Sequence, residues 1–265
     1  MAAQKTILQI FSTCPEVLFV PEPLPQGIVT SVECDSRAVK EGSVFIAIEG
    51  EHYDGHAFIP SAIEKGALIA VGTQPRWKEL FPQQYVLVKD ARKALAYIAA
   101  GFNDFPARKM TVIGVTGTDG KTTTTHLIFQ ILRQAGLKAG MISTVNAVIE
   151  DEIIDTGFHV TTPEAPVVQA LLARMVAHGL NYVVLEATSH GLAQQRVAAC
   201  EFDIGVFTNI THEHLDYHGT YENYLHTKAK LIEYLAQTRP KENGAIRLTV
   251  LNKDDLSYQH LKKIL

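Results

Sequence analysis

The chain has 265 residues, of which 46 % are hydrophobic and 20 % charged, as in an ordinary soluble globular protein with one large or two modest domains. Its formal net charge of −4 argues against a nucleic-acid partner, because such a partner requires a basic surface. The three cysteines, Cys14, Cys34 and Cys200, form neither a CxxC pair nor a zinc pattern, so a reducing compartment is indicated. No stretch approaches the roughly 20 apolar residues that cross a bilayer. We therefore expect a cytoplasmic monomer that does not bind membranes.

The first part of the chain alternates strand-like and helix-like segments up to about Pro106. Strands are predicted at 43–49, 68–72 and 85–88, and helices at 58–65 and 91–103. This alternation is typical of an α/β unit. The polar, proline-containing segment 103–108 is a candidate linker, so we place the first domain at residues 1–107.

The second part, residues 108–265, has short apolar strands rich in β-branched residues, which are typical of parallel strands covered on both faces. These strands are predicted at 110–115, 139–144, 182–186, 204–207 and 248–251. Helices are predicted at 121–135, 164–178 and 221–236. The pattern predicts a doubly wound, mostly parallel sheet, whose ligands collect at the carboxyl ends of its strands. Polar clusters follow three of these strands and should therefore converge on one edge.

A glycine-rich loop, Gly114-Val-Thr-Gly-Thr-Asp-Gly-Lys-Thr122, joins the first of these strands to the following helix. Such a loop offers backbone N–H groups and a helix N-terminus to phosphates. Lys121 can reach the terminal phosphates, and the Thr122 hydroxyl can bind Mg²⁺. The usual pattern GxxxxGK[ST] requires glycine at position 115, where this chain has valine. The loop with TGTDGKTT resembles that of the Mur ligases of peptidoglycan synthesis and their relative folylpolyglutamate synthetase.

Further motifs narrow this resemblance. In the first part, the segments 34–37 (CDSR), 42–45 (GSVF) and 50–55 (GEHYDG) are similar to a UDP-sugar-binding domain of the Mur ligase family. In the second part, the segments 161–164, 186–196 and 208–219 resemble the family member that adds the third residue of the stem peptide. The resemblance implies a small UDP-sugar-binding α/β domain followed by an ATP-binding central domain. The resemblance also implies a separate C-terminal domain that selects the amino acid, and we expect this chain to lack it.

The resemblance also implies three sets of site residues. Those expected to bind ATP are Gly117, Thr118, Asp119, Gly120, Lys121, Thr122, Thr123, Asn209, Asn252 and Asp255. Those expected to bind UDP-N-acetylmuramoyl-dipeptide are Ser36, Glu51, His52, Tyr53, Thr161, Thr162, Thr188, Gln194 and Arg196. Those expected to bind Mg²⁺ are Thr122, Glu186, His214 and Lys228, the last as N6-carboxylysine. Lys121, Glu186, His214 and Lys228 are the candidate catalytic residues.

Glu186 ends an apolar strand, where a carboxylate is costly to bury unless it meets a cation. We therefore favour a magnesium ligand over a helix cap or a turn acid. The histidines at 212, 214 and 218 superficially resemble a zinc site together with Asp216. Their irregular spacing and the absence of cysteine disfavour zinc. An Asn-Asp turn without function remains an alternative for Asn252 and Asp255.

Lys228 is predicted to lie on a helix whose buried stripe includes Tyr221, Tyr224, Leu231 and Leu235, at spacings of three and four. A buried ammonium is disfavoured, so the pKa of Lys228 should fall and leave some neutral amine. A neutral amine can add CO₂ and form a carbamate, as the resemblance implies. The alternative is a lysine whose head group reaches solvent.

The implied reaction is an ATP-dependent ligation. The free carboxylate of the bound D-glutamyl group attacks the γ-phosphate of ATP, and the amine of a diamino acid then attacks the acyl phosphate. We expect this chain to bind its ligands without completing the reaction, because it stops after Asn252-Lys-Asp-Asp255. Two alternatives are a non-catalytic UDP-sugar- or nucleotide-binding protein and a folylpolyglutamate synthetase-like ligase.

Overall fold

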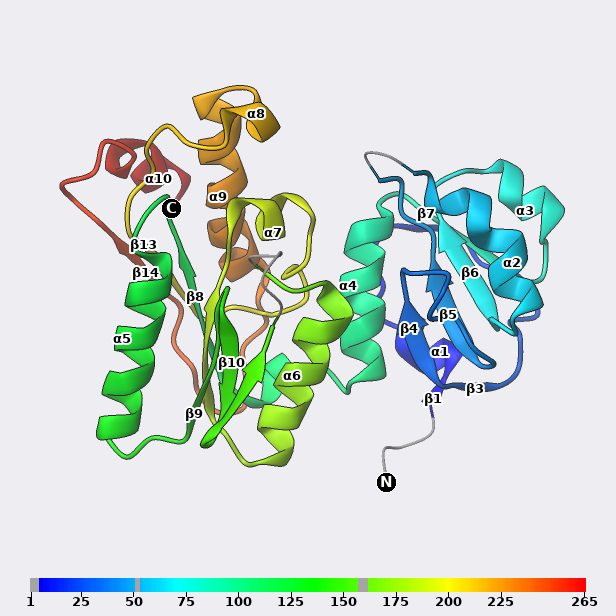
Figure 1. The fold of residues 1–265 in the computed structure, drawn as a ribbon, viewed down its shortest axis with the longest axis horizontal. Helices are drawn as coiled ribbons and strands as arrows, with labels where there is room; N and C mark the ends of the chain where they lie inside the picture. The colour runs from blue at the N-terminus through cyan, green and yellow to red at the C-terminus, as the bar shows by residue number, and fades with distance from the viewer. Residues whose placement is uncertain (1–4, 51–52, 157–161) are drawn as a thin grey trace. The chain divides into compact units, whose positions relative to one another are not determined.

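The computed structural model of this protein describes residues 5–50, 53–156 and 162–265. The chain divides into two compact units, Met1–Asp104 and Phe105–Leu265 (Figure 1). The predicted boundary, after residue 107, lies three residues further along. Of the intervening residues, Phe105 precedes a short 3-10 helix, η2 (Pro106–Lys109), and the other two belong to it; an Arg108–Glu201 ion pair of 2.8 Å ties this helix to the second unit.

The first unit contains a five-stranded sheet with the order β2-β7-β6-β5-β4. Four of the strands are parallel, namely β4 (Ser31–Glu33), β5 (Ser43–Ile46), β6 (Ile69–Gly72) and β7 (Tyr85–Val88). The edge strand β2 (Val17–Phe19) runs antiparallel to β7. A separate two-stranded sheet is formed by β1 (Lys5–Thr6) and β3 (Ile28–Val29).

Helices cover this sheet because its strands are apolar on both faces. The helices are α1 (Ile7–Phe11), η1 (Gly55–Phe58), α2 (Ile59–Glu64), α3 (Arg76–Leu80) and α4 (Ala91–Phe102). Phe45 and Tyr85 of the sheet pack with Ile59 of α2 and Trp77 of α3 in one core cluster. The longest helix, α4, packs against α1 and β4.

The second unit contains a seven-stranded sheet with the order β11-β10-β9-β12-β8-β13-β14. Five strands are parallel: β8 (Thr111–Thr116), β9 (Ala139–Ile142), β12 (Tyr182–Glu186), β13 (Ile204–Phe207) and β14 (Leu248–Leu251). The remaining two, β10 (Asn146–Ile149) and β11 (Glu152–Asp155), form an antiparallel hairpin beside β9. The strand β8 lies between β12 and β13, so the carboxyl ends of these three strands are adjacent.

The helices of the second unit lie on both faces of the sheet. They are α5 (Lys121–Gln134), α6 (Ala165–Ala177), α7 (Ser189–Ala193), α8 (Leu215–His218), α9 (Tyr221–Gln237) and α10 (Tyr258–Ile264). Phe129 of α5 packs on Val115 and Val184. On the other face, a Cβ at Gly114 would lie 2.9 Å from Leu231 of α9, so the glycine allows this helix to approach the sheet closely.

The predicted α/β fold with a doubly wound sheet is confirmed. The strands predicted at 85–88, 182–186, 204–207 and 248–251 have the expected bounds. The strand predicted over 43–49 is shorter, because β5 ends at Ile46. No helix in the described part of the chain is both long and apolar enough to cross a membrane.

Candidate phosphate and substrate sites

The glycine-rich loop joins β8 to α5 at the carboxyl edge of the second sheet. Gly117 has φ +152°, and a Cβ there would lie 1.9 Å from the hydroxyl of Thr208. Gly120 has φ +74° and precedes the first residue of α5. Both positions require glycine, since other residues are strained at these dihedral angles. The Lys121 ammonium donates to the Thr118 carbonyl at 2.6 Å, so it lies over the loop.

The loop is braced by residues that follow β13. The Thr118 N–H donates to the Asn209 carbonyl at 2.8 Å, and the Asp119 N–H donates to Asn209 Oδ1 at 2.9 Å. The Thr208 hydroxyl donates to the Asp119 carbonyl at 2.6 Å. These contacts hold the backbone conformation of the loop. Thr123 lies in the first turn of α5.

Asn252 and Asp255 follow β14 and hold the same segment. Asn252 Nδ2 donates to the Thr208 carbonyl at 2.8 Å, and Asp255 Oδ1 accepts from the Ile210 N–H at 3.1 Å. Their side chains therefore support the residues that brace the phosphate loop. Contact with a nucleotide remains a prediction for both.

Glu186 ends β12 beside the phosphate loop and is only 2 % exposed. Its Oε2 accepts from the Thr122 hydroxyl at 3.0 Å and from the Thr144 N–H at 3.2 Å. Its Oε1 is buried and has no hydrogen-bond partner among the described residues. Burial raises the pKa of this carboxyl above its usual value, whereas the Thr144 N–H and the Thr122 hydroxyl oppose that shift.

Lys228 lies on the buried face of α9 and is 1 % exposed. Its Nζ donates to the Gly117 carbonyl at 2.6 Å and lies 4.6 Å from the centre of the Tyr224 ring. Burial, together with the nearby Lys121 charge, lowers the pKa of Lys228 to about 7. The predicted loss of charge is therefore supported, and the ammonium does not reach solvent. Tyr221, in contrast, is only partly buried.

A group of rings lies beside Lys228. The ring centre of His190 is 4.3 Å from that of Tyr217, 5.0 Å from that of His214 and 5.8 Å from that of His218. Tyr224 lies 5.1 Å from His218. Burial, together with the neighbouring His190, lowers the pKa of His218 to about 4. His214 is thus in the same region as Lys228, as the sequence predicts.

The predicted dipeptide-binding residues of the second unit cluster beside Glu186. The hydroxyls of Thr162 and Thr188 lie 2.9 Å apart, and the Thr162 hydroxyl donates to the Glu186 carbonyl at 3.3 Å. Arg196 donates to the Thr162 carbonyl and to Gln194 Oε1, at 2.5 and 2.7 Å. Its guanidinium also pairs with Glu164 at 2.7 Å. Thr161 lies outside the described residues.

Ser36 and Tyr53 line a cavity of about 470 Å³ in the first unit. The cavity lies beyond the carboxyl ends of β4 and β5. Asp35 and Arg37 are also in its wall, where the Arg37 guanidinium lowers the pKa of Asp35 to about 2. Ser36 and Tyr53 therefore share one site in the first unit. Glu51 and His52 lie outside the described residues.

The donors around Glu186 fit a magnesium ion bound to phosphate. Mg²⁺ retains several waters and is commonly held by one or two carboxylates together with phosphate oxygens. The Thr122 hydroxyl oxygen and the unpaired Glu186 carboxylate oxygen are oxygen ligands suited to such a magnesium ion. Within residues 5–50, 53–156 and 162–265, no group of three or more His, Cys, Asp or Glu side chains is arranged to hold a metal ion by itself.

Four contributors to these sites were not among the predicted site residues. Thr144 positions the Glu186 carboxylate, Tyr224 bonds the Thr118 hydroxyl at 3.1 Å, Thr208 packs against Gly117, and Glu164 pairs with Arg196. The sequence contained a signal for Tyr224, because its spacing places it one turn before Lys228 on the same helical face. Thr144 had none, because its backbone N–H makes the contact.

The fold and the loop geometry define a phosphate-loop α/β protein, and comparisons with known proteins identify its family. Residues 115–265 match the Mur ligase middle domain, and residues 28–103 match the Mur ligase family catalytic domain. The chain therefore belongs to the Mur ligase family.

Its relatives include a UDP-N-acetylmuramyl-tripeptide synthetase of Roseiflexus sp., 48 % identical over 86 % of this chain and 45 % of that protein. A UDP-N-acetylmuramoyl-L-alanyl-D-glutamate–2,6-diaminopimelate ligase of Geobacillus thermodenitrificans is 42 % identical over 88 % of this chain and 46 % of that protein. A solved structure of a ligase of that name has a TM-score of 0.80 at 26 % identity, covering 98 % of this chain and 50 % of the other. The chain spans about half the length of the curated relatives that it matches.

Proposed function

We propose that this chain supplies the UDP-sugar-binding and ATP-binding parts of a ligase that adds a diamino acid to UDP-N-acetylmuramoyl-L-alanyl-D-glutamate. The observation that carries the proposal is the convergence of the phosphate loop, buried Glu186 and buried Lys228 at one sheet edge. The names of the relatives supply the substrate class.

In this proposal, the loop N–H groups and Lys121 bind the phosphates of ATP. Mg²⁺, held by Thr122, Glu186, His214 and carboxylated Lys228, would neutralise phosphate charge when bound. Arg196 and the hydroxyls of Thr162 and Thr188 hold the D-glutamyl carboxylate near the γ-phosphate, which supplies proximity. The carboxylate oxygen forms a bond to phosphorus as ADP leaves, and the diamino acid amine then forms the amide bond as phosphate leaves.

The low pKa of Lys228 supports its carboxylation, because only the neutral amine attacks CO₂. The new N–C bond gives a carbamate and releases one proton. The test is ¹³C NMR of the chain in ¹³C-bicarbonate, with a carbamate signal expected. Lys228→Met should abolish the signal, and Lys230→Met, two residues along the same helix, should retain it. A signal that survives Lys228→Met would contradict this assignment.

The substrate assignment is tested by calorimetric titration with UDP-N-acetylmuramoyl-L-alanyl-D-glutamate, and with UDP-N-acetylmuramic acid as the matched ligand that lacks the dipeptide. The dipeptide ligand should bind more tightly, and Arg196→Met should remove that advantage. Equal affinities for both ligands in the parent chain would contradict the substrate assignment. Mass spectrometry after addition of ATP and a diamino acid then reports whether the tripeptide forms.

A further inference from the structure

A buried histidine lies at the carboxyl edge of the first sheet, outside the residues assigned so far. His56 is 0 % exposed and is surrounded by partners. Its Nδ1 lies 2.6 Å from Asp54 Oδ1, and its Nε2 accepts from the Thr73 N–H at 2.9 Å. Asp54 Oδ2 accepts from Gln74 Nε2 at 2.8 Å. Because Nε2 accepts a hydrogen bond, the ring is neutral and carries its proton on Nδ1.

The partners of His56 are themselves held in place. The Tyr85 hydroxyl donates to the Gln74 carbonyl at 3.0 Å, and a Cβ at Gly72 would lie 2.6 Å from His56 Nε2. The His56 N–H also donates to Asp54 Oδ1, at 2.9 Å. Burial raises the pKa of Asp54, but the His56 and Gln74 hydrogen bonds outweigh it and lower the pKa, so the carboxylate is charged. We call Asp54, His56, Thr73 and Gln74 the histidine clasp.

The clasp connects the end of β6 to the segment that carries Tyr53. The Gly50 N–H donates to the Tyr53 carbonyl, and the Gly55 N–H donates to the Ile48 carbonyl, each at 2.9 Å. Ile48, Tyr53 and Gly55 all line the cavity that contains Ser36. The Asp54 carboxylate therefore holds the backbone that follows Tyr53, an exposed tyrosine that lines this cavity.

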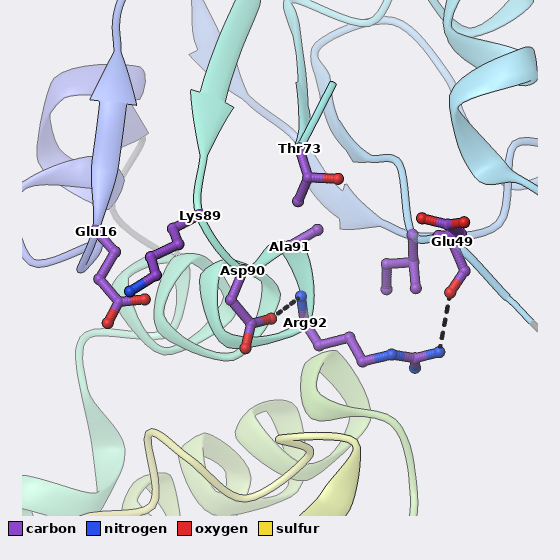
Figure 2. A pocket seen from close by; sticks show the side chains of 8 residues that line it. Glu16, Glu49, Thr73, Lys89, Asp90, Ala91 and Arg92 are labelled. Carbon is purple, nitrogen blue, oxygen red and sulfur yellow. Dashed lines mark hydrogen bonds between the residues drawn. The ribbon is translucent and has the colours of Figure 1, made fainter. Parts of the chain in front are cut away.

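A second cavity, of about 390 Å³, is lined by Glu49 at the start of this segment (Figure 2). Ile48 lines both cavities, and Thr73 of the clasp lines the second one. In Figure 2 the Arg92 side chain extends from the start of α4 to the Glu49 carbonyl, at 3.4 Å. The segment is thus held at Glu49 by one long, exposed bond and at Asp54 by shorter, partly buried ones.

We infer that Asp54 and His56 are positioning residues for the nucleotide-sugar site, and that they act through Tyr53. The inference rests on the proposed function, because it takes the Ser36–Tyr53 cavity as the site for a uridine nucleotide. The clasp sets the place of Tyr53 before the ligand arrives, so its loss should weaken uridine nucleotide binding without affecting the adenine nucleotide site.

The test uses UDP as the probe, titrated calorimetrically into the 265-residue chain with saturating ADP to occupy the phosphate loop. His56→Gln loses the rigid ring that bridges Asp54 and Thr73, and Asp54→Asn places an amide donor against a donor. Each variant should weaken UDP binding tenfold or more and change ADP affinity less than twofold. Arg92→Met, which removes the exposed bond, should weaken UDP binding less than threefold.

A double-mutant cycle that combines Tyr53→Ala with His56→Gln separates a positioning role of the clasp from a general loss of stability. The double variant Tyr53→Ala/His56→Gln should bind UDP no more weakly than Tyr53→Ala, because the clasp acts through that ring. Ile98→Ala, buried in α4 and lining neither cavity, should lower the melting temperature and leave UDP binding unchanged. The ¹⁵N shifts of His56 should report the Nδ1–H tautomer in the parent chain.

Parent-like UDP affinity in His56→Gln and Asp54→Asn, or losses that multiply in the double variant, would overturn the positioning role. Those results would leave the proposed function intact. A parent chain that binds ADP but not UDP would overturn the nucleotide-sugar assignment of the cavity and this inference with it.

Discussion

Replacing Lys228 by methionine should change how the stability of this chain depends on pH. The pKa of Lys228 is about 7 in the folded chain, against an ordinary lysine value of 10.5 that applies when the chain is unfolded. Between these values the unfolded chain binds more protons, so the Lys228 contribution to stability rises with pH. Below the folded pKa both states are protonated, and the full penalty of the buried charge applies.

The magnitude follows from linkage. Between about pH 7 and pH 9, the parent should gain about 2 kcal/mol of unfolding free energy from Lys228, at 1.36 kcal/mol per pKa unit. Methionine has similar length and no charge, so Lys228→Met should lack this rise. It should also be more stable near pH 7 by about 1–3 kcal/mol, since replacing a buried charge with an apolar group often stabilises. The lost bond to the Gly117 carbonyl reduces that gain.

The assay is urea unfolding of both chains in CO₂-free buffer at several pH values. Other titrating groups are shared, so the difference between the two chains isolates Lys228. Lys230→Met serves as the control and should follow the parent. A difference between the parent and Lys228→Met that stays constant from pH 7 to pH 9 would refute the buried, low-pKa ammonium.

Three further predictions concern the same edge of the sheet. Gly117→Ala should destabilise the chain by about 2–3 kcal/mol in urea unfolding, because its Cβ would clash with Thr208, whose hydroxyl is held by two hydrogen bonds. Gly120→Ala, whose Cβ meets nothing within 4 Å, should cost only about 1 kcal/mol. Equal costs would contradict the close-approach argument. Glu186→Gln should abolish the magnesium dependence of ADP binding, and unchanged magnesium dependence would exclude Glu186 as a ligand. In the parent, ionisation of the buried Glu186 carboxyl lowers the unfolding free energy as pH rises through its raised pKa, and Glu186→Gln should remove this loss. Arg196→Met should lower the unfolding free energy by about 1–3 kcal/mol, because the Thr162 carbonyl and Glu164 lose their partner, and a variant as stable as the parent would show that these bonds contribute little.

The sequence predicted the parallel strands because their side chains are apolar on both faces, which leaves continuous runs such as Tyr182-Val-Val-Leu. It predicted the burial of Lys228 because spacings of three and four define a helical face. It did not predict α1 or α3, each of five residues, because one and a half turns carry too little periodicity. The hairpin of β10 and β11 was also missed, although Glu150-Asp151 between apolar runs is a turn signal.

The site was predicted only in part, because its geometry depends on contacts between distant segments. The phosphate loop is a local motif and could be recognised directly. The clasp around His56 forms only when the end of β6 lies beside the Asp54–His56 segment in the folded chain, because Thr73 and Gln74 lie 17 and 18 residues beyond His56 in the sequence. A lone histidine in a sequence carries no signal of such partners.

We propose that the loop, Glu186 and Lys228 form one nucleotide-phosphate site. Calorimetric titration of the chain with ADP, with and without Mg²⁺, in the parent and in Lys121→Ala tests this proposal. The parent should bind ADP more tightly with Mg²⁺, and Lys121→Ala should bind at least tenfold more weakly because the ammonium at the loop is lost. ADP binding that is equal in both chains, or a parent that does not bind ADP at all, would contradict the proposal.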